Sequence, residues 1–199
     1  MTGRVLLLRH PPVARAWAGR CYGRSDMGLS RAGAAMARDI VADIAGRGVT
    51  AVVHSDMRRT RPLAAAIART AGCPAIAEPR WRERDFGSWE GRRWHSIWRE
   101  TGDAMDRMMT DPAGFCPGGG ETGANIATRA AAAWHDLPRG GVTVVVAHGG
   151  SIAAARAWLA GDSLEQMVGY IPACGAIVEV ARDSRPSRAA DPPARALRR

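Results

Sequence analysis

Three places in this sequence set histidine, arginine or serine side chains directly after an apolar run. Arg9 and His10 end the run VLLLRH. Ser55 follows VTAVVH, and His148 follows VTVVVA. A neutral imidazole is a nucleophile and a proton carrier near neutral pH, whereas a guanidinium group binds anionic oxygens through paired donors. If the three runs end side by side, their polar side chains can bind a small anion and act on it.

The three runs have the composition of buried parallel strands. Each is continuously apolar rather than alternating, as in strands that are covered on both faces. Helical patterns lie in the segments 29–48, 59–72 and 125–140, and a last strand is expected in 175–181. This alternation predicts an α/β fold, a three-layer αβα sandwich with a mostly parallel central sheet. Because ligands of such sheets bind beyond the carboxyl ends of the strands, the polar groups are expected to face one crevice.

The expected helices carry recognisable start and stop signals. Ser30 is the predicted N-cap of the first helix, which has an apolar stripe through Ile40 and Ile44. Gly46 is its stop signal. Pro62 is compatible with the second helix only in the first turn.

Composition excludes several functions. The chain has 199 residues and a net charge of +9 at pH 7, and all 28 of its basic residues are arginine. Without lysine there can be no Walker-type phosphate loop and no Schiff base. The arginines are scattered, so a small anion is a better partner than nucleic acid or a membrane surface.

Length and cysteine content bound the architecture. We expect one domain, 1–182, followed by a disordered tail rich in proline and arginine, 183–199. The cysteines are far apart and form no CxxC pair, so no metal cluster or disulfide framework is predicted. With no signal peptide ahead of Val5, and with apolar runs too short to span a bilayer, we expect a cytoplasmic protein.

Each chemical signal also has an ordinary structural explanation. Arg9 and His10 could form a surface hydrogen-bonding pair, and His148 could cap a turn. Ser55 could cap a helix whose arginines are solvated. The stretch PGGGET could be a flexible loop, since its glycines lack the spacing of a dinucleotide fingerprint. The stretch RERDFGSWEG could be an exposed charged loop. Taken singly, no signal assigns a function.

Taken together, the motifs resemble in order and spacing those of the histidine phosphatases, the phosphoglycerate mutase-like superfamily. The resemblance covers residues 4–180. Its elements are LLLRH, CYGRSDMGLSRAG, HSDMRRT, RERDFGSWEG, PGGGET and VVVAHGGSI. The stretches CYGRSDMGLS and FGSWEG are most similar to the short branch that includes the α-ribazole phosphatases of cobalamin synthesis.

The resemblance implies roles for five residues. His10 would be the nucleophile and Glu83 the proton donor. Arg9 and Arg59 would bind the phosphoryl group, and His148 would be a second catalytic histidine that also contacts phosphate. These roles fit the side chains, because an imidazole attacks phosphorus without a base, guanidinium forks match phosphoryl oxygens, and an alkoxide leaves poorly without a proton. Since arginine supplies the positive charge, no metal and no cofactor is expected.

The chain departs from the family pattern near the nucleophile. Pro11 and Pro12 stand where the family has glycine and commonly an acidic residue. The usual pocket asparagine is absent, with Ala16 and Trp17 in that region, and the usual S-S-P-L is replaced by H-S-D-M. We expect the chemistry to survive, the substrate pocket to differ, and the proline pair to form a rigid turn that fixes His10.

The sequence therefore predicts a metal-independent phosphomonoesterase that acts through a phosphohistidine on a small phosphorylated metabolite, with α-ribazole 5′-phosphate as the first candidate. A phosphoglycerate mutase-like activity, a broad-specificity phosphatase and a non-catalytic phosphate-binding module remain alternatives. Nucleic acid and membranes are not expected partners, and the oligomeric state is left open. Trp94 and Trp98 could cover a flat heterocycle, but their helical spacing favours core packing.

Overall fold

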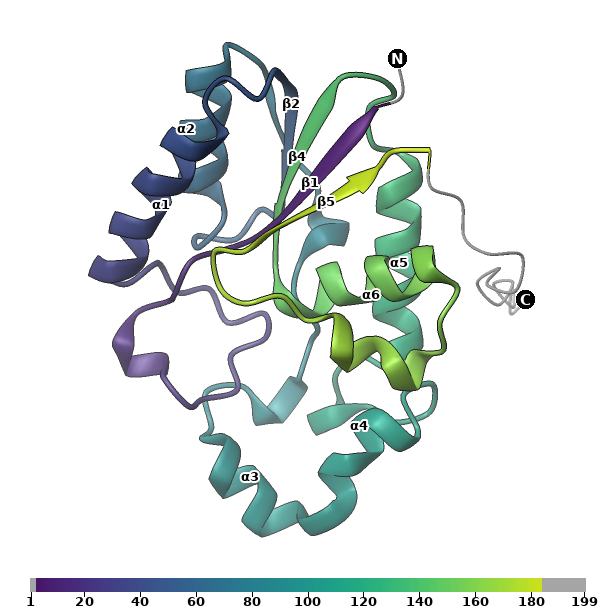
Figure 1. Ribbon diagram of the computed structural model, residues 1–199. Coiled ribbons are helices and arrows are strands. Elements are labelled where there is room, and N and C mark those ends of the chain that lie inside the picture. The colour runs from purple at the N-terminus through teal and green to yellow at the C-terminus, as the bar shows by residue number, and fades with distance from the viewer. Residues whose placement is uncertain (1–2, 184–199) are drawn as a thin grey trace, which may run out of the picture.

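The protein, described here by a computed structural model over residues 3–183, contains a five-stranded sheet. The strands in chain order are β1 (Arg4–Arg9), β2 (Val49–His54), β3 (Ala75–Ala77), β4 (Val142–Ala147) and β5 (Ile177–Ala181). Their order across the sheet is β3-β2-β4-β1-β5 (Figure 1). Every neighbouring pair is parallel except β1 and β5, which are antiparallel. The predicted mostly parallel sheet is confirmed.

Helices cover both faces of this sheet. They are α1 (Arg31–Ile44), α2 (Arg61–Ala71), α3 (Trp94–Thr101), α4 (Arg107–Thr110), α5 (Gly123–His135) and α6 (Gly149–Ala160). Figure 1 shows α1 and α2 on one side of the sheet and α5 and α6 on the other. The helices α3 and α4 lie below the lower end of the sheet in the same view. The three-layer αβα sandwich is thus confirmed, with a small helical cap at one end.

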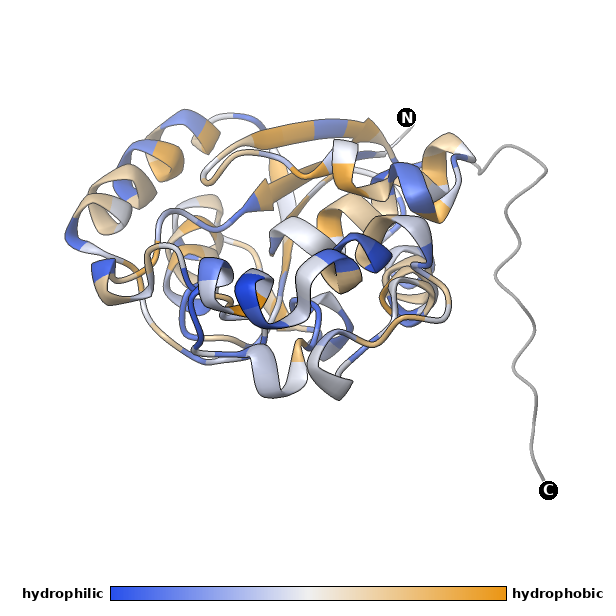
Figure 2. Cartoon of the chain, turned by 90° about the horizontal axis from the view of Figure 1, so that it is seen from below, coloured by the Kyte–Doolittle hydropathy of each residue, from blue (hydrophilic) through white to orange (hydrophobic). Residues whose placement is uncertain are grey.

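Alternate side chains of β1 face the two helical layers. Leu6 and Leu8 pack with apolar side chains of α1 and α2, whereas Val5 and Leu7 pack with those of α5 and α6. All residues of β4 are buried. Because both faces of these central strands are covered, their sequences are continuous apolar runs. In Figure 2 the strands are largely orange, while α1 alternates between blue and orange along its length.

The strand register brings the carboxyl ends of the central strands level. Arg9 is paired with Ala147 across β1 and β4, and His54 is paired with Val146 across β2 and β4. The residues that follow each strand therefore leave the sheet at one edge. This register is the physical reason that side chains far apart in the sequence converge.

The start and stop signals act as predicted. Ser30 caps α1, since its Oγ accepts a hydrogen bond of 2.9 Å from the Gly33 amide. Gly46, just beyond the helix end, has a φ of 83°, which favours glycine. Pro62 lies in the first turn of α2.

Helix α6 and strand β3 are among the elements that were not predicted from the sequence. Helix α6 is buried around most of its circumference, from Gly149 to Trp158, so it has little of the amphipathic period by which helices are recognised. Strand β3 is a short edge strand whose three residues are all exposed. Neither element has the pattern on which the sequence reasoning relied.

The C-terminal end of the described chain is docked on α5. Arg182 is buried, and its Nη2 donates hydrogen bonds of 3.0 Å to the carbonyls of His135 and Leu137. The predicted tail, 183–199, lies beyond the described residues except for its first member, so the domain span and the tail stay predictions. Within residues 3–183 no helix combines the length and the apolar character needed to cross a membrane.

Candidate active site

The edge at which β1, β2 and β4 end carries two buried histidines. His10 follows β1 and His148 follows β4, and neither side chain has any exposed surface. Their ring centroids are 5.2 Å apart and the rings meet edge to face at 63°. Ser55 follows β2 and is also fully buried. The predicted convergence of the three strand ends is present.

His10 is held as a neutral imidazole with one free nitrogen. Its Nδ1 is 2.7 Å from the Pro11 carbonyl oxygen, which can only accept, so Nδ1 carries the proton. Burial, followed by the charges of Arg59 and Arg9, lowers the pKa of His10 to about 3, against the opposing effect of the Pro11 carbonyl. Its Nε2 is buried without a partner. The lone pair of Nε2 is therefore available as a nucleophile.

His148 carries its proton on the other nitrogen. Its Nδ1 is 3.1 Å from the Nε of Arg59, which can only donate, so Nδ1 is the acceptor. The Nε2 proton then points to the Ser55 hydroxyl oxygen at 2.8 Å. Burial, followed by the charge of Arg59, holds the pKa of His148 well below its usual range. Two neutral imidazoles with complementary tautomers thus line the site.

Arg59 is a fully buried cation just ahead of α2. Besides its bond to His148, its Nη1 donates to the Ser25 carbonyl at 2.7 Å and its Nη2 donates to the Gly23 carbonyl at 2.6 Å. Its guanidinium carbon lies 5.3 Å from the ring centroid of Tyr22. These contacts fix a positive charge next to both histidines.

Arg9 brings a second cation to the site. Its Nη1 donates to the Pro172 carbonyl at 2.6 Å, while its Nε is buried without a partner. A Cβ at Gly149 would lie only 3.2 Å from the Arg9 guanidinium carbon, so this glycine lets the side chain lie across the start of α6. The Nε of Arg9 and the Nε2 of His10 belong to consecutive residues, and both lack a hydrogen-bond partner, as expected for groups that bind a ligand.

The carboxylate of Glu83 contacts the main chain at the start of α6. It is 9% exposed, and its two carboxylate oxygens are 3.0 and 3.1 Å from the Gly150 amide nitrogen. Its Oε1 also accepts from the Arg84 amide at 2.8 Å. A Cβ at residue 150 would overlap Oε1, so a side chain there would displace the Glu83 carboxylate. All five residues singled out in the sequence therefore meet at this edge.

Comparison with known proteins assigns this arrangement to a family. The model of the histidine phosphatase superfamily (branch 1) matches residues 5–188 of the chain. The chain belongs to the histidine phosphatase superfamily.

Relatives in this superfamily carry names of two activities. The chain is 33% identical over 150 residues to a Photorhabdus laumondii protein named "Probable phosphoglycerate mutase GpmB", a match that covers 73% of this chain and 69% of that one. The structure of mycobacterial glucosyl-3-phosphoglycerate phosphatase superposes with a TM-score of 0.78 at 25% identity, covering 88% of this chain and 90% of that one. The structure of the α-ribazole phosphatase from Shigella flexneri gives a TM-score of 0.75 at 20% identity, covering 88% and 89%. The relatives are thus named for phosphatase or mutase activity.

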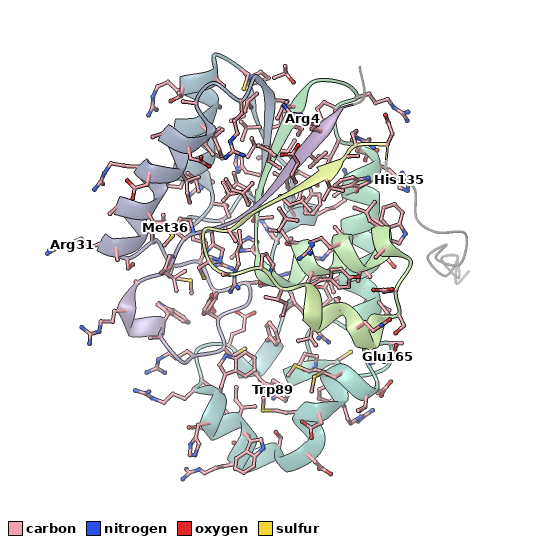
Figure 3. All side chains as sticks on the ribbon, in the orientation of Figure 1. Arg4, Arg31, Met36, Trp89, His135 and Glu165 are labelled. Atoms are coloured by element: carbon pink, nitrogen blue, oxygen red, sulfur yellow. The ribbon has the colours of Figure 1, made fainter. Side chains whose placement is uncertain are left out.

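A pocket of about 280 Å³ opens beside Arg9 and Glu83. Most of its lining is apolar and includes Phe86, Trp94, Met108, Met109, Val168 and Ile171. Arg84 and Glu165 are the other charged residues of the lining. Figure 3 labels Glu165 on the outer segment that follows α6. The pocket also borders Gly149 and Gly150 at the start of α6, whereas His10 and His148 are not among its lining residues.

The three tryptophans between residues 89 and 98 have different environments. Trp94 is half-buried, lines the pocket and lies edge to face with Phe86, with 5.5 Å between ring centroids. Trp98 is 56% exposed, so the prediction of core packing is wrong for this residue. Ile97 is the residue of α3 that enters the core, together with Trp89 from the preceding loop. Helical spacing alone could not tell which face of α3 is covered.

The proline pair is irregular backbone with no turn assigned to it, and its carbonyls accept hydrogen bonds. The Pro11 carbonyl accepts from the ring of His10. The Pro12 carbonyl accepts from the Ser30 amide at 3.0 Å and lies against Gly33, where a Cβ would overlap it. The segment after His10 thus rests on the start of α1.

Three contributors to the site were not assigned a role from the sequence. Ser55 binds His148 instead of capping α2, whose N-cap is Thr60. Tyr22 lies edge to face with His10, with 6.4 Å between ring centroids, and burial raises its pKa. Gly150 binds the carboxylate of Glu83. The motifs contained all three, but their partners are distant in sequence and could not be read from spacing.

Proposed function

We propose that this histidine phosphatase hydrolyses a phosphate monoester through a phosphohistidine on His10. The observation that carries the proposal is the buried, unpartnered Nε2 of His10 beside the unpartnered Nε of Arg9. A neutral imidazole with its proton fixed on Nδ1 needs no further base to attack phosphorus. The Nε2 atom of His10 is a buried polar atom without a hydrogen-bond partner, which is typical of a functional site.

In the first step the Nε2 lone pair of His10 attacks phosphorus in line with the leaving alcohol. The bond from nitrogen to phosphorus forms as the bond from phosphorus to the ester oxygen breaks. Glu83, in its protonated form, gives its proton to that oxygen, so the product leaves as an alcohol. Arg9 and Arg59 neutralise the charge on the equatorial oxygens, and His148 contacts one of them by exchanging its Nε2–H bond to the Ser55 hydroxyl for a bond to that oxygen.

In the second step water hydrolyses the phosphohistidine. The Glu83 carboxylate formed in the first step takes a proton from water as the water oxygen attacks phosphorus. The bond from nitrogen to phosphorus breaks, which returns the electron pair to His10 and releases inorganic phosphate. Two moderate barriers replace a single high one.

The guanidinium groups of Arg9 and Arg59 support a reaction without a metal ion. They place two positive charges at the phosphoryl position, and the charge of Arg59 is already buried, so it acts in a medium of low dielectric constant. We therefore propose that activity persists in excess chelator.

The apolar pocket supports a substrate whose alcohol part is flat and weakly polar. Phe86 and Trp94 offer ring faces and edges, and Met108 and Met109 offer polarizable side chains that adapt to such a surface. Among known metabolites of this size, α-ribazole 5′-phosphate is the first to test, as the motifs CYGRSDMGLS and FGSWEG also favour it.

Phosphoglycerate chemistry is the second candidate, because the relative from Photorhabdus laumondii is named as a mutase. A glycerate carboxylate needs a cation besides Arg9 and Arg59. Arg84 lines the pocket, but its Nε donates to the Glu121 carbonyl and its Nη2 donates to the Phe115 carbonyl. These bonds use two of its five N–H donors and fix its orientation, so a glycerate carboxylate would have to be bound by the donors that remain.

The test of the proposed function is phosphate release from 4-nitrophenyl phosphate and α-ribazole 5′-phosphate, with and without chelator. Phosphate release in both conditions supports the proposal. Binding without turnover would assign the chain to a non-catalytic phosphate-binding module. Conversion of 3-phosphoglycerate to its 2-phospho isomer, without release of phosphate, would assign it to the mutases.

We also propose a cytoplasmic location and small phosphorylated metabolites as the only class of partner. All four cysteines are free thiols, as expected in a reducing compartment. The arginines are scattered along the sequence and not gathered in one run, which favours a small anion over nucleic acid as the partner.

A further inference from the structure

The guanidinium group of Arg129 donates hydrogen bonds to the main-chain carbonyls around Glu83. This residue of α5 donates from Nη1 to the carbonyls of Arg80 and Arg82 at 2.6 and 2.7 Å, and from Nη2 to the carbonyl of Glu83 at 3.0 Å. Its remaining donors bind the carboxylate of Glu121 at 2.6 and 2.8 Å. A guanidinium group has five N–H donors, so each one has a partner here.

Glu121 joins this arginine to the same loop by separate contacts. It is largely buried, and its amide donates to the Asp85 carbonyl at 2.9 Å. The Nε of Arg84 donates to the Glu121 carbonyl at 2.8 Å. The ion pair of Glu121 and Arg129 is therefore a fixed bridge between α5 and the segment 80–85, which we call the acid loop.

The glycines of PGGGET allow the main chain of this stretch to lie directly against the main chain at residues 85 and 86. A Cβ at Gly118 would overlap the Phe86 carbonyl, and a Cβ at Gly120 would overlap the Asp85 carbonyl. Two main-chain segments touch here without side chains between them. The glycine-rich stretch is therefore neither a free loop nor a nucleotide site, since it presses Glu121 against the acid loop.

Glu83 is consequently held from both ends. Arg129 binds its carbonyl oxygen, and the Gly150 amide binds its carboxylate. Arg129 is absent from the lining of the pocket beside Arg9 and Glu83. Its charge also helps to lower the pKa of His148, so a replacement that keeps the charge isolates what its hydrogen bonds contribute through Glu83.

We propose that Arg129, together with Glu121, is a positioning residue for the proton donor. It fixes the acid loop so that the Glu83 carboxyl lies at the leaving-group oxygen. This inference rests on the proposed function, and specifically on Glu83 as the acid. A small shift of the loop would weaken proton transfer, while attack by His10 on an ester that needs no proton would continue.

The dependence of rate on the leaving group separates this role from a structural one. We would measure kcat/KM of the wild type and of Arg129→Lys on 4-nitrophenyl phosphate, phenyl phosphate and an alkyl phosphate. Lysine keeps the charge but has three donors in place of five, so the acid loop loses contacts. We expect at most about a threefold loss on 4-nitrophenyl phosphate and about a tenfold or greater loss on the alkyl ester. Glu121→Gln should follow the same trend.

The matched control is Arg182→Lys. Arg182 is another arginine that donates to two backbone carbonyls, those of His135 at the C-terminal end of α5 and of Leu137 just beyond it. Its replacement should lower the melting temperature and change kcat/KM by the same factor for every ester. If Arg129→Lys does not fold, Glu121→Gln alone carries the test.

Three results would overturn the inference. The first is a loss of kcat/KM in Arg129→Lys and Glu121→Gln that is the same for all esters, while Glu83→Gln loses kcat/KM mainly on the alkyl ester. That result would leave the proposed function intact. The second is full additivity of Arg129→Lys with Glu83→Gln on the alkyl ester, because a residue that acts through Glu83 adds nothing once the acid is gone. The third is a uniform loss in Glu83→Gln itself, which would remove the acid role and the inference together.

Discussion

His10 and His148 lie edge to face at the end of the sheet, yet they carry their protons on different nitrogens. The Pro11 carbonyl fixes the proton of His10 on Nδ1, and the Arg59 side chain forces the proton of His148 onto Nε2. One histidine is thus prepared to attack and the other to donate a hydrogen bond. The predictions below follow from this arrangement and from the contacts of Glu83.

Ser55→Ala should impair His148 without touching substrate. The variant leaves the Nε2 proton of His148 buried without its acceptor, which should cost about 1–3 kcal/mol of unfolding free energy. Loss of the fixed ring orientation should lower kcat about 10-fold or more. Urea unfolding and steady-state kinetics check both effects. Ser88→Ala, at an exposed serine that binds the Gly118 carbonyl, is the control and should change neither quantity appreciably.

Gly150→Ala should reduce activity although alanine is the better helix former. In an isolated helix the change would be favourable by up to about 1 kcal/mol. Here the new Cβ overlaps Oε1 of Glu83 and must displace the acid. We expect kcat/KM on an alkyl phosphate to fall about tenfold or more, and Gly169→Ala, which has open space around its Cβ position, to remain near the wild type. Equal rates for the two variants would show that the carboxylate tolerates displacement.

Trp94 and Trp98 offer a matched pair for the substrate pocket. Trp94 lines it, whereas Trp98 lies one helical turn further on and is exposed. Trp94→Ala should lower kcat/KM for α-ribazole 5′-phosphate by about tenfold or more and change glycerol phosphate far less, because only the larger alcohol reaches the ring. Trp98→Ala should resemble the wild type on both esters. If both variants behave alike, the apolar pocket does not select the substrate.

The stability of the protein should fall as the pH drops below 6.5. His10 in the unfolded chain takes up a proton near its ordinary pKa of 6.5, whereas the folded protein resists protonation until about pH 3. Stability is therefore complete above pH 6.5 and is lost progressively toward pH 3. His148 acts in the same direction. Urea unfolding at pH 7.5 and 5.0 should show a smaller decrease for His10→Gln than for the wild type, and identical decreases would contradict the neutral form of His10.

Much of the fold and of the site could be predicted because their signals are local. A continuous apolar strand such as β4 identifies a sheet covered on both faces, and parallel strands bring Arg9, His10 and His148 to one edge. The caps of α1 are equally local, since Ser30 binds an amide three residues away. In each case short stretches of sequence contain both the cause and the effect.

The rest depends on contacts between distant segments. The amide of Gly150 and the carboxylate of Glu83 are 67 residues apart, and the ring of His148 and the hydroxyl of Ser55 are 93 apart. No periodicity relates such pairs. The environment of Trp98 was misjudged for a similar reason, because the side of α3 that is covered depends on where the rest of the chain folds.

The most direct test of the account is the site of covalent phosphorylation. The protein would be mixed with 4-nitrophenyl phosphate, quenched within milliseconds in base, digested and analysed by mass spectrometry and phosphorus NMR. We expect an acid-labile, base-stable phosphoryl group on Nε2 of His10, present in the wild type, enriched in Glu83→Gln with the slowed second step, and absent from His10→Ala. A phosphoryl group on Nδ1 or on another residue, or steady turnover by His10→Ala at the wild-type rate, would contradict the proposed mechanism.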